Sequence, residues 1–360
     1  MRSWIFFLAI LLNTIQEIVA QTATERDTLC AFISKSLPVF PEINKTDSAT
    51  ILVTQYETKP NRPDTALYIV VTNRELIRTR YGLTYSNNCN NELAYLAVSR
   101  TNNSYQIQAC NSLEEALKIH MPADEYLIYA HGYGRTFNSI LEESEKIKRF
   151  YNVPLIVFDW PSKYPNMFEL RSYLYSRNNL KSSCSHFAQF LKDYQKYVQK
   201  NEVHKPIYTS LILHSMGNAL LEQSIKQNLL TDLDINLLDN IILNAAAIRK
   251  SGHRKWLANT HLSRNIYVIS NYNDPTLYGV YWLTLRKQLG RSAIKKQANN
   301  IKYINLGHIA GGYHNYFINK ELMQNHPELK ILYFKMLTKN NLQELEKCSE
   351  LLLTKEDTQE

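Results

Sequence analysis

The chain has 360 residues, of which 44% are hydrophobic and 21% charged, and its formal net charge is +8. This is the composition of a globular protein, long enough for one large domain or two small ones with a sizeable core. Its lysines and arginines are scattered among acidic residues, and basic runs such as Ile248–Trp256 lack the interleaved aromatic residues of a nucleic-acid platform. We therefore expect no nucleic acid partner, and a solvated basic surface that favours anionic surroundings.

The first residues have the pattern of a secretory signal peptide. Arg2 precedes an apolar run from Trp4 to Leu12, and the small residue Ala20 offers a cleavage position. Because the run is too short to span a bilayer, residues 1–20 are predicted to be a signal peptide of a secreted or periplasmic protein without stable membrane insertion. An uncleaved anchor is the alternative.

The cysteines do not indicate a metal site. There are five of them, at positions 30, 89, 110, 184 and 348, and they follow no metal-ligand spacing. In an exported protein Cys89 and Cys110 are expected to pair across a hairpin-like segment. The odd number leaves at least one thiol unpaired or intermolecular.

After a polar N-terminal extension over residues 21–62, short β-branched runs alternate with helical patterns up to about residue 340. Residues 341–360 form a charged tail. Near-continuous apolar strands separated by helices are buried on both faces, so we predict an α/β domain over residues 63–340 with a mostly parallel sheet and helices on both faces. The expected strands are Ala66–Thr72, Ala94–Ser99, Glu125–Gly132, Pro154–Trp160, Ile207–Ser215, Asn240–Ala247, Asn265–Asn271 and Ile301–Leu306.

The segment "LILHSMGNALLEQ" places Ser215 directly between a strand and a helix. This is the position of a nucleophilic serine in a G-x-S-x-G elbow, with Gly217 in the second glycine position. Leu213 stands where the first glycine is usual, so Ser215 has the alternative interpretation of an ordinary helix start.

A serine hydroxyl needs a base, and the base needs an acid that orients it. Asp274 follows one later strand and His314 follows the last, which gives the chain order Ser, Asp, His of α/β-hydrolases. Asp274 before a proline is also typical of an Asx-turn. His308 competes with His314, but Gly311 and Gly312 favour a loop that turns His314 inward.

Acyl transfer also needs N–H donors for the oxyanion. The turn His131-Gly132-Tyr133-Gly134 follows an early strand and is typical of the turn that supplies one such donor in esterases. We expect the N–H groups of Tyr133 and Met216 to form the oxyanion hole, with no metal or cofactor.

Several motifs resemble a bacterial family of α/β-hydrolases of unknown function that is esterase- and lipase-like. They are "VVTNREL", "IYAHGYGRTF", "VFDWPS", "HSMGN", "SNYNDPTL" and "GYHNYF", spread over residues 65–320. The resemblance implies an α/β-hydrolase fold, catalytic roles for Ser215, Asp274 and His314, and a site wall that includes His131 and Trp160. The chain departs from the family pattern at Leu213 and at Ala245–Ala247, where an A-P-D segment is common.

These features predict a serine hydrolase of carboxylic or lipid esters that works through an acyl-enzyme. The alternative is a hydrolase-fold protein that has lost catalysis and acts as a binding or envelope-interaction module. A nucleotide-binding protein is not indicated, because the chain has neither G-x-G-x-x-G nor G-x-x-x-x-G-K-[ST].

Overall fold

The computed structural model describes residues 51–54, 65–79, 82–101, 104–119, 123–164, 169–201, 206–258, 260–292 and 301–339. The predicted signal peptide, most of the predicted extension and the charged tail lie outside these ranges. No helix in the described part of the chain has the length and apolar character needed to cross a membrane.

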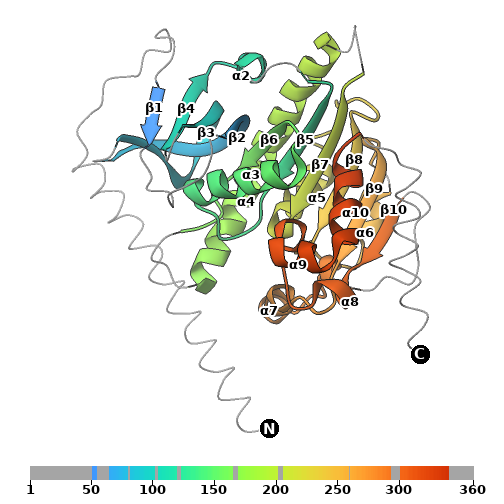
Figure 1. The fold of residues 1–360 in the computed structure, drawn as a ribbon. Helices are drawn as coiled ribbons and strands as arrows, with labels where there is room; N and C mark the ends of the chain where they lie inside the picture. The colour runs from blue at the N-terminus through green and yellow to red at the C-terminus, as the bar shows by residue number, and fades with distance from the viewer. Residues whose placement is uncertain are drawn as a thin grey trace, which may run out of the picture. The chain divides into compact units, whose positions relative to one another are not determined.

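The described residues are organised around one ten-stranded sheet with the order β1-β4-β3-β2-β6-β5-β7-β8-β9-β10 (Figure 1). Its parallel part, from β2 to β10, confirms the predicted mostly parallel sheet. The strands of this part are β2 (Thr65–Thr79), β6 (Leu155–Asp159), β5 (Glu125–Ala130), β7 (Tyr208–His214), β8 (Leu238–Asn244), β9 (Ser263–Ser270) and β10 (Ile301–Asn305).

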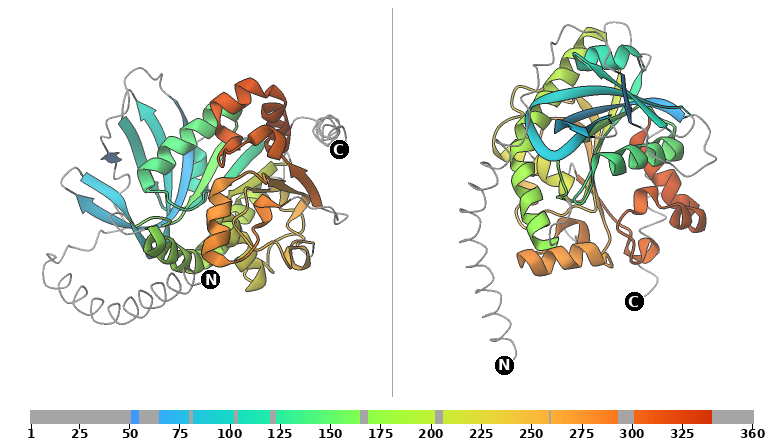
Figure 2. Two further views of the ribbon diagram at one scale, coloured as in Figure 1. Left: turned by 90° about the horizontal axis from the view of Figure 1, so that it is seen from below. Right: turned by 90° about the vertical axis from the view of Figure 1, so that its left-hand side faces the viewer.

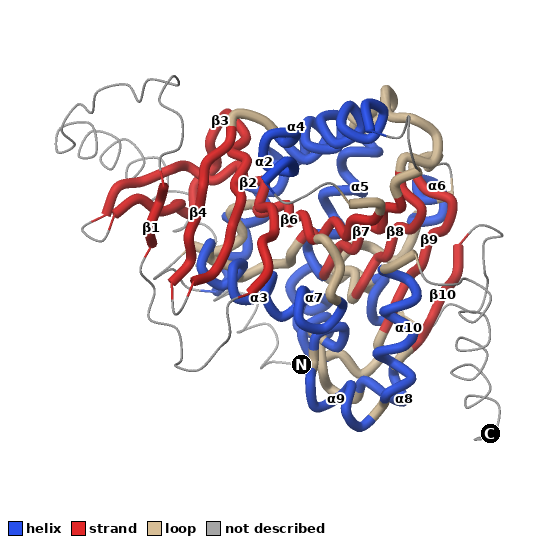
Figure 3. Tube along the Cα trace, turned by 45° about the horizontal axis from the view of Figure 1, so that its top comes forward, coloured by secondary structure: helices blue, strands red, loops and turns tan. Residues whose placement is uncertain are grey.

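Antiparallel strands extend the sheet beyond β2 (Figure 3). They are β3 (Gly82–Thr101), β4 (Ser104–Cys110) and β1 (Ile51–Thr54). The strand expected at Ala94–Ser99 is therefore the second half of a longer antiparallel strand. Its partner β4 was not predicted, and β1 lies inside the predicted N-terminal extension.

Two helical layers cover the parallel strands, as Figure 2 shows. One layer packs its apolar residues with one face of the sheet and contains α2 (Leu113–Ile119), α4 (Glu169–Asn201), α5 (Asn218–Lys226) and α6 (His253–Leu257). The other face is covered by α3 (Phe137–Tyr151), α8 (Gly307–Ala310), α9 (Lys320–Asn325) and α10 (Pro327–Leu337). The strands were predictable because both faces are apolar: every residue of β6 is buried, as are the last five of β5.

The expected Cys89–Cys110 disulfide is wrong. Both cysteines are free thiols. Cys89 pairs in the β2–β3 ladder with Arg74, whereas Cys110 pairs in the β3–β4 ladder with Tyr95. Because the two cysteines belong to different ladders of the same sheet, the hairpin does not bring them together.

The direction in which the chain adds strands reverses at the centre of the sheet. The chain goes from β5 to β6 on one side and then returns to the other side of β5 to form β7. Loops that follow β5 and β7 therefore leave the sheet in opposite directions, and in open parallel sheets this switch point is where ligands bind. The HGYG turn follows β5, and Ser215 follows β7.

Candidate active site

Ser215 occupies a sharp turn between β7 and α5. Its φ of 51° lies in the left-handed region, which side chains other than that of glycine rarely adopt. The turn continues as a short 3-10 segment, Ser215–Gly217, and Ser215 is only 7% exposed. A Cβ on Gly217 would lie 2.4 Å from the carbonyl oxygen of His131, so the close approach of the β5 loop requires glycine there. This is the geometry of a nucleophile elbow.

Leu213 is accommodated in the core rather than in the turn. Its side chain is completely buried in the apolar cluster shared with α4 and α5. In the sheet it stands beside the small Ala130 on β5 and beside Leu243 on β8. The position two residues before Ser215 therefore holds a leucine because the helical layer leaves a buried apolar site for it.

Asn218, the first residue of α5, holds the turn from the inside. Its amide nitrogen lies 3.0 Å from the carbonyl oxygen of Leu213, 2.9 Å from that of Ser215 and 3.2 Å from that of Asn244. One buried amide thus ties the end of β7, the serine and the end of β8 together. This asparagine belongs to the motif "HSMGN", but its role depends on β8 lying next to β7 and does not follow from the motif alone.

His314 and Asp274 form a close pair. Nδ1 of His314 lies 2.6 Å from Oδ2 of Asp274, whose side chain is completely buried. Oδ1 of Asp274 accepts the N–H of Leu277 at 3.0 Å, so the same carboxylate caps α7 (Pro275–Thr284). The helix cap and the contact with His314 therefore use different oxygens of Asp274, so a capping role does not exclude the proposed role as the acid.

The loop that carries His314 is fixed by Asn271, a residue whose role was not predicted from the sequence. Its buried amide nitrogen donates to the carbonyl oxygens of Gly311 and Tyr313, at 2.9 and 3.0 Å. His308, the competing histidine, turns elsewhere: Nδ1 lies 3.2 Å from the hydroxyl of Tyr272. Of the two histidines, only His314 contacts the acid.

The structure brings the His314–Asp274 pair to the side of the serine turn. The ring of His214, the residue before Ser215, lies 4.8 Å from the ring of His314, centroid to centroid. Within the described residues no hydrogen bond joins the Ser215 hydroxyl to His314. Catalytic hydrogen bonds of this kind are often long without substrate and shorten in the substrate complex.

His214 is kept uncharged. Burial is the main cause that lowers its pKa well below the usual value, and the neighbouring His314 lowers it further. Its Nδ1 lies 3.0 Å from the amide nitrogen of Asn244, which only donates, so this ring nitrogen carries no proton. The ring next to His314 is therefore neutral.

The HGYG turn runs along the serine. A Cβ on Gly132 would lie 2.8 Å from Cβ of Ser215 and 3.4 Å from its hydroxyl oxygen. Further along the turn, the N–H of Gly134 donates to the carbonyl oxygen of Ser162 at 2.8 Å. The N–H of Arg135 donates to the hydroxyl oxygen of Ser162 at 2.9 Å. Tyr133 follows Gly132 directly and Met216 follows Ser215, so the two expected oxyanion donors belong to segments that meet at the hydroxyl.

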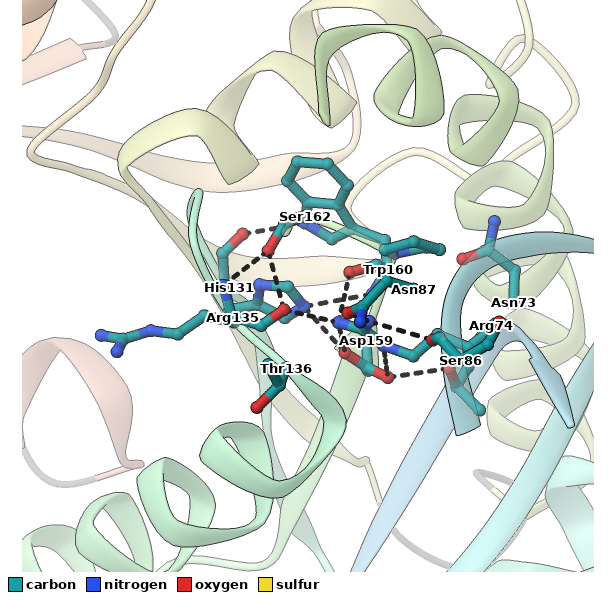
Figure 4. Close-up of polar contacts among 12 residues, drawn as sticks. Asn73, Arg74, Ser86, Asn87, His131, Arg135, Thr136, Asp159, Trp160 and Ser162 are labelled. Atoms are coloured by element: carbon teal, nitrogen blue, oxygen red, sulfur yellow. Dashed lines mark hydrogen bonds and ion pairs between the residues drawn. The ribbon is translucent and has the colours of Figure 1, made fainter. Parts of the chain in front are cut away.

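A buried ionic network supports this turn from behind (Figure 4). Nε of Arg74 lies 2.7 Å from Oδ2 of Asp159, and Nη2 donates to the carbonyl oxygens of Trp160 and Arg135 at 2.8 and 2.9 Å. Oδ1 of Asp159 lies 2.9 Å from Nε2 of His131. Arg74 and Asp159 were present in the quoted motifs "VVTNREL" and "VFDWPS", but their pairing depends on β2 lying next to β6.

Burial raises the pKa of Asp159, but the guanidinium of Arg74 and the hydrogen bond from His131 outweigh it and lower the pKa to about 2. The carboxylate of Asp159 is therefore charged at neutral and mildly acidic pH. It holds the cationic Arg74 and the turn in one arrangement.

His131 and Trp160 do not form the wall of the site. Both are completely buried, their rings are stacked with centroids 5.5 Å apart, and the indole N–H donates to the carbonyl oxygen of His131 at 2.9 Å. The expectation is corrected: these side chains lie behind the turn and fix its backbone.

The region after β8 supplies no acid. Ala245–Ala247 stand there, and the N–H of Ala247 donates to the carbonyl oxygen of Ser215 at 3.1 Å. Asp274 is therefore the carboxylate that serves the histidine. Among the described residues, no group of three or more His, Cys, Asp or Glu side chains is placed to hold a metal ion.

A cavity of about 550 Å³ opens beside the Ser215 turn. Met216, Ala219 and Ala247 line it near Ser215, and α4 contributes Tyr173 and Leu180. Basic side chains also line it, namely Arg177, Lys181, Lys226, Arg249 and Arg286.

A match to a protein family agrees with this architecture. Residues 108–282 match a family described as "Alpha/beta hydrolase of unknown function (DUF900)". Carboxyl esterase 2 from the mycorrhizal fungus Tuber melanosporum is similar over 86% of this chain and 96% of its own, with 11% identity and a TM-score of 0.36. Esterase PE8 is similar over 60% of this chain and 94% of its own, with 13% identity and a TM-score of 0.34. No curated protein matches the sequence.

Proposed function

Since this chain has the α/β-hydrolase fold and matches an α/β-hydrolase family over residues 108–282, we propose that it is a serine hydrolase of carboxylic or lipid esters. The single observation that carries the proposal is the His314–Asp274 pair, with 2.6 Å between Nδ1 and Oδ2, beside a serine held in a left-handed turn. The three residues follow β7, β9 and β10 at the carboxyl edge of one parallel sheet, although 59 and 40 positions separate them (274 − 215 and 314 − 274).

In the proposed mechanism the Ser215 hydroxyl oxygen attacks the ester carbonyl carbon while Nε2 of His314 takes its proton. The carboxylate of Asp274 accepts a hydrogen bond from the Nδ1–H of His314, which fixes the tautomer and stabilises the imidazolium. The N–H groups of Tyr133 and Met216 donate to the negative oxygen of the tetrahedral intermediate. When the intermediate collapses, the alcohol leaves with the proton from His314.

The second half of the reaction uses the same groups. Water gives a proton to Nε2 of His314 and attacks the acyl-enzyme, and the carboxylic acid leaves as the Ser215 hydroxyl is restored. The cavity that reaches Met216 is large enough for an acyl chain or a small alcohol group. The predicted signal peptide supports a site of action outside the cytoplasm.

A fluorophosphonate probe tests the nucleophile. We expect the folded protein to be labelled and Ser215→Ala to remain unlabelled, while p-nitrophenyl esters of increasing chain length report the preferred acyl group. Folded protein that resists the probe and hydrolyses no ester of the series would contradict the proposal. That result would favour the inactive binding protein, the alternative that the absent Ser215–His314 hydrogen bond supports.

A further inference from the structure

Helix α7 is apolar and yet exposed. Its sequence, PTLYGVYWLT, contains no charged residue, and Leu277 is its only buried residue. Tyr278, Trp282 and Leu283 are 44%, 52% and 51% exposed, and Leu285, which follows the helix, is 75% exposed. A surface helix normally turns its apolar residues toward the core, so a cluster like this one is typical of a contact surface.

Basic side chains surround this apolar surface. A cavity of about 640 Å³ joins Leu285 to α6, and no acidic residue lines it; its cations are Arg249, Lys250, Arg254, Lys255, Arg286 and Lys287. On the other side, the guanidinium of Arg291 lies 4.7 Å from the ring centroid of Tyr278. Within the described chain, Lys255 and Lys287 form no ion pair.

Aromatic and leucine side chains among arginines and lysines match the chemistry of an anionic lipid surface. Trp and Tyr favour the headgroup level of a bilayer, leucines favour the acyl chains, and Lys and Arg are attracted to lipid phosphates. A nucleic acid would bind the cations through its phosphates and stack its bases on the aromatic rings, but it has no apolar surface to contact Leu283 and Leu285. We therefore propose that α7, Leu285 and the flanking basic residues form a docking surface for an anionic lipid bilayer.

The docking surface leads to the nucleophile. The cavity beside Met216 shares Arg249 and Arg286 with the basic cavity, and Leu283 lines it as well. Helix α7 begins directly after Asp274. A bilayer on this surface thus meets the opening of the active-site cavity, so the substrate would be an ester lipid with an anionic headgroup. This last step rests on the proposed function, whereas the docking itself does not.

Sedimentation with vesicles tests the docking independently of catalysis. The full chain with Ser215→Ala is mixed with vesicles of phosphatidylcholine alone or with an equal part of phosphatidylglycerol. We expect binding to the anionic vesicles only, weakened by salt because the attraction is screened. Since each cation near an anionic surface contributes roughly a fivefold gain in binding, Lys255→Glu with Lys287→Glu should weaken it by at least about twentyfold.

Matched variants separate this surface from the rest of the chain. Trp282→Ser with Leu285→Ser should also weaken vesicle binding, by about tenfold or more. Ile235→Ser, at a residue 74% exposed, and Lys146→Glu with Lys330→Glu, at exposed residues of α3 and α10, should leave it unchanged. The N-terminal apolar run is present in every variant, so a difference between them reports α7 and its cations.

The proposal would be overturned if the α7 variants and their controls bound vesicles equally well. It would also be overturned if the protein bound equally to vesicles with and without phosphatidylglycerol. Displacement from the vesicles by a single-stranded oligonucleotide, added at the same total negative charge as the lipid, would also overturn the proposal. It would indicate that the surface binds nucleic acid instead. Hydrolysis of p-nitrophenyl acetate by Trp282→Ser with Leu285→Ser should equal that of the wild type. If that ester is not cleaved at all, the proposed function fails while the vesicle result still decides the docking.

Discussion

The carboxylate of Asp274 serves two partners: Oδ2 lies 2.6 Å from Nδ1 of His314, and Oδ1 accepts the N–H of Leu277 at the start of α7. Asp274→Asn keeps a side-chain oxygen for the helix cap but loses the negative charge. We expect kcat to fall by about a thousandfold or more with little change in melting temperature.

Asp274→Ala provides the control, because it removes the cap as well as the charge. It should lose a similar factor in kcat and a further ~1 kcal/mol of stability, measured by denaturant unfolding. If Asp274→Asn keeps full activity, this residue is a helix cap and nothing more.

Asn271 positions the base through the backbone of its loop, since its amide nitrogen donates to Gly311 and Tyr313. Asn271→Ala should lower kcat by about ten- to a hundredfold, because a displaced loop misplaces the imidazole, while KM changes little. Asn273→Ala is the matched control: its amide nitrogen donates to Gly307 at 2.9 Å, away from His314. Equal losses in both variants would show a general effect on loop stability instead.

Leu213 has a structural role in this elbow. Because its side chain is completely buried in the core, Leu213→Ala should destabilise the protein by about 2–5 kcal/mol. The kcat per labelled serine should stay near that of the wild type. A variant that gains activity would instead mean that the leucine obstructs the turn.

Gly217 is required where the β5 loop crosses the elbow. A Cβ there would lie 2.4 Å from the His131 carbonyl oxygen, so Gly217→Ala should displace the turn and abolish probe labelling. Gly279→Ala, in α7 with no atom within 4 Å of the added Cβ, should be neutral or stabilise by up to about 1 kcal/mol. Labelling of Gly217→Ala at the wild-type rate would refute this close approach.

Acid should weaken the support of the HGYG turn. The pKa of Asp159 is about 2 in the folded protein, against an ordinary value of 3.8, so its contribution to stability is complete above pH 3.8. As the pH falls from 3.8 to about 2, the unfolded chain takes up the proton first, and about 2 kcal/mol of stability is lost. Urea unfolding across this range measures the loss.

Asp159→Asn should lack this contribution to the pH dependence and be less stable by about 3–5 kcal/mol at neutral pH, because Arg74 remains buried without its counter-charge. Arg74→Met in the same background should recover part of that stability. If the unfolding free energy of Asp159→Asn fell with pH as steeply as that of the wild type, other carboxylates would be responsible for the acid sensitivity.

The features of this site that could be predicted are those that depend on short stretches of sequence. Apolar runs located the parallel strands, and chain order placed Ser215, Asp274 and His314 after them. The Arg74–Asp159 pair was not predictable in the same way, because it joins residues 85 positions apart whose strands are neighbours only in the folded sheet. The role of Asn271 was not predicted for a related reason. It donates to backbone carbonyl groups of another loop, and a contact with the backbone does not depend on the residue types there, so no sequence motif indicates it.

The position of Arg74 has a practical consequence for any attempt to excise a minimal fragment. The family match over residues 108–282 includes the serine and its acid, yet it leaves out Arg74 and His314. A fragment cut to those limits would bury Asp159 and His131 without the guanidinium of Arg74, and it would lack His314, the proposed base. We therefore expect an active fragment to need residues from before β2 to beyond the loop after β10.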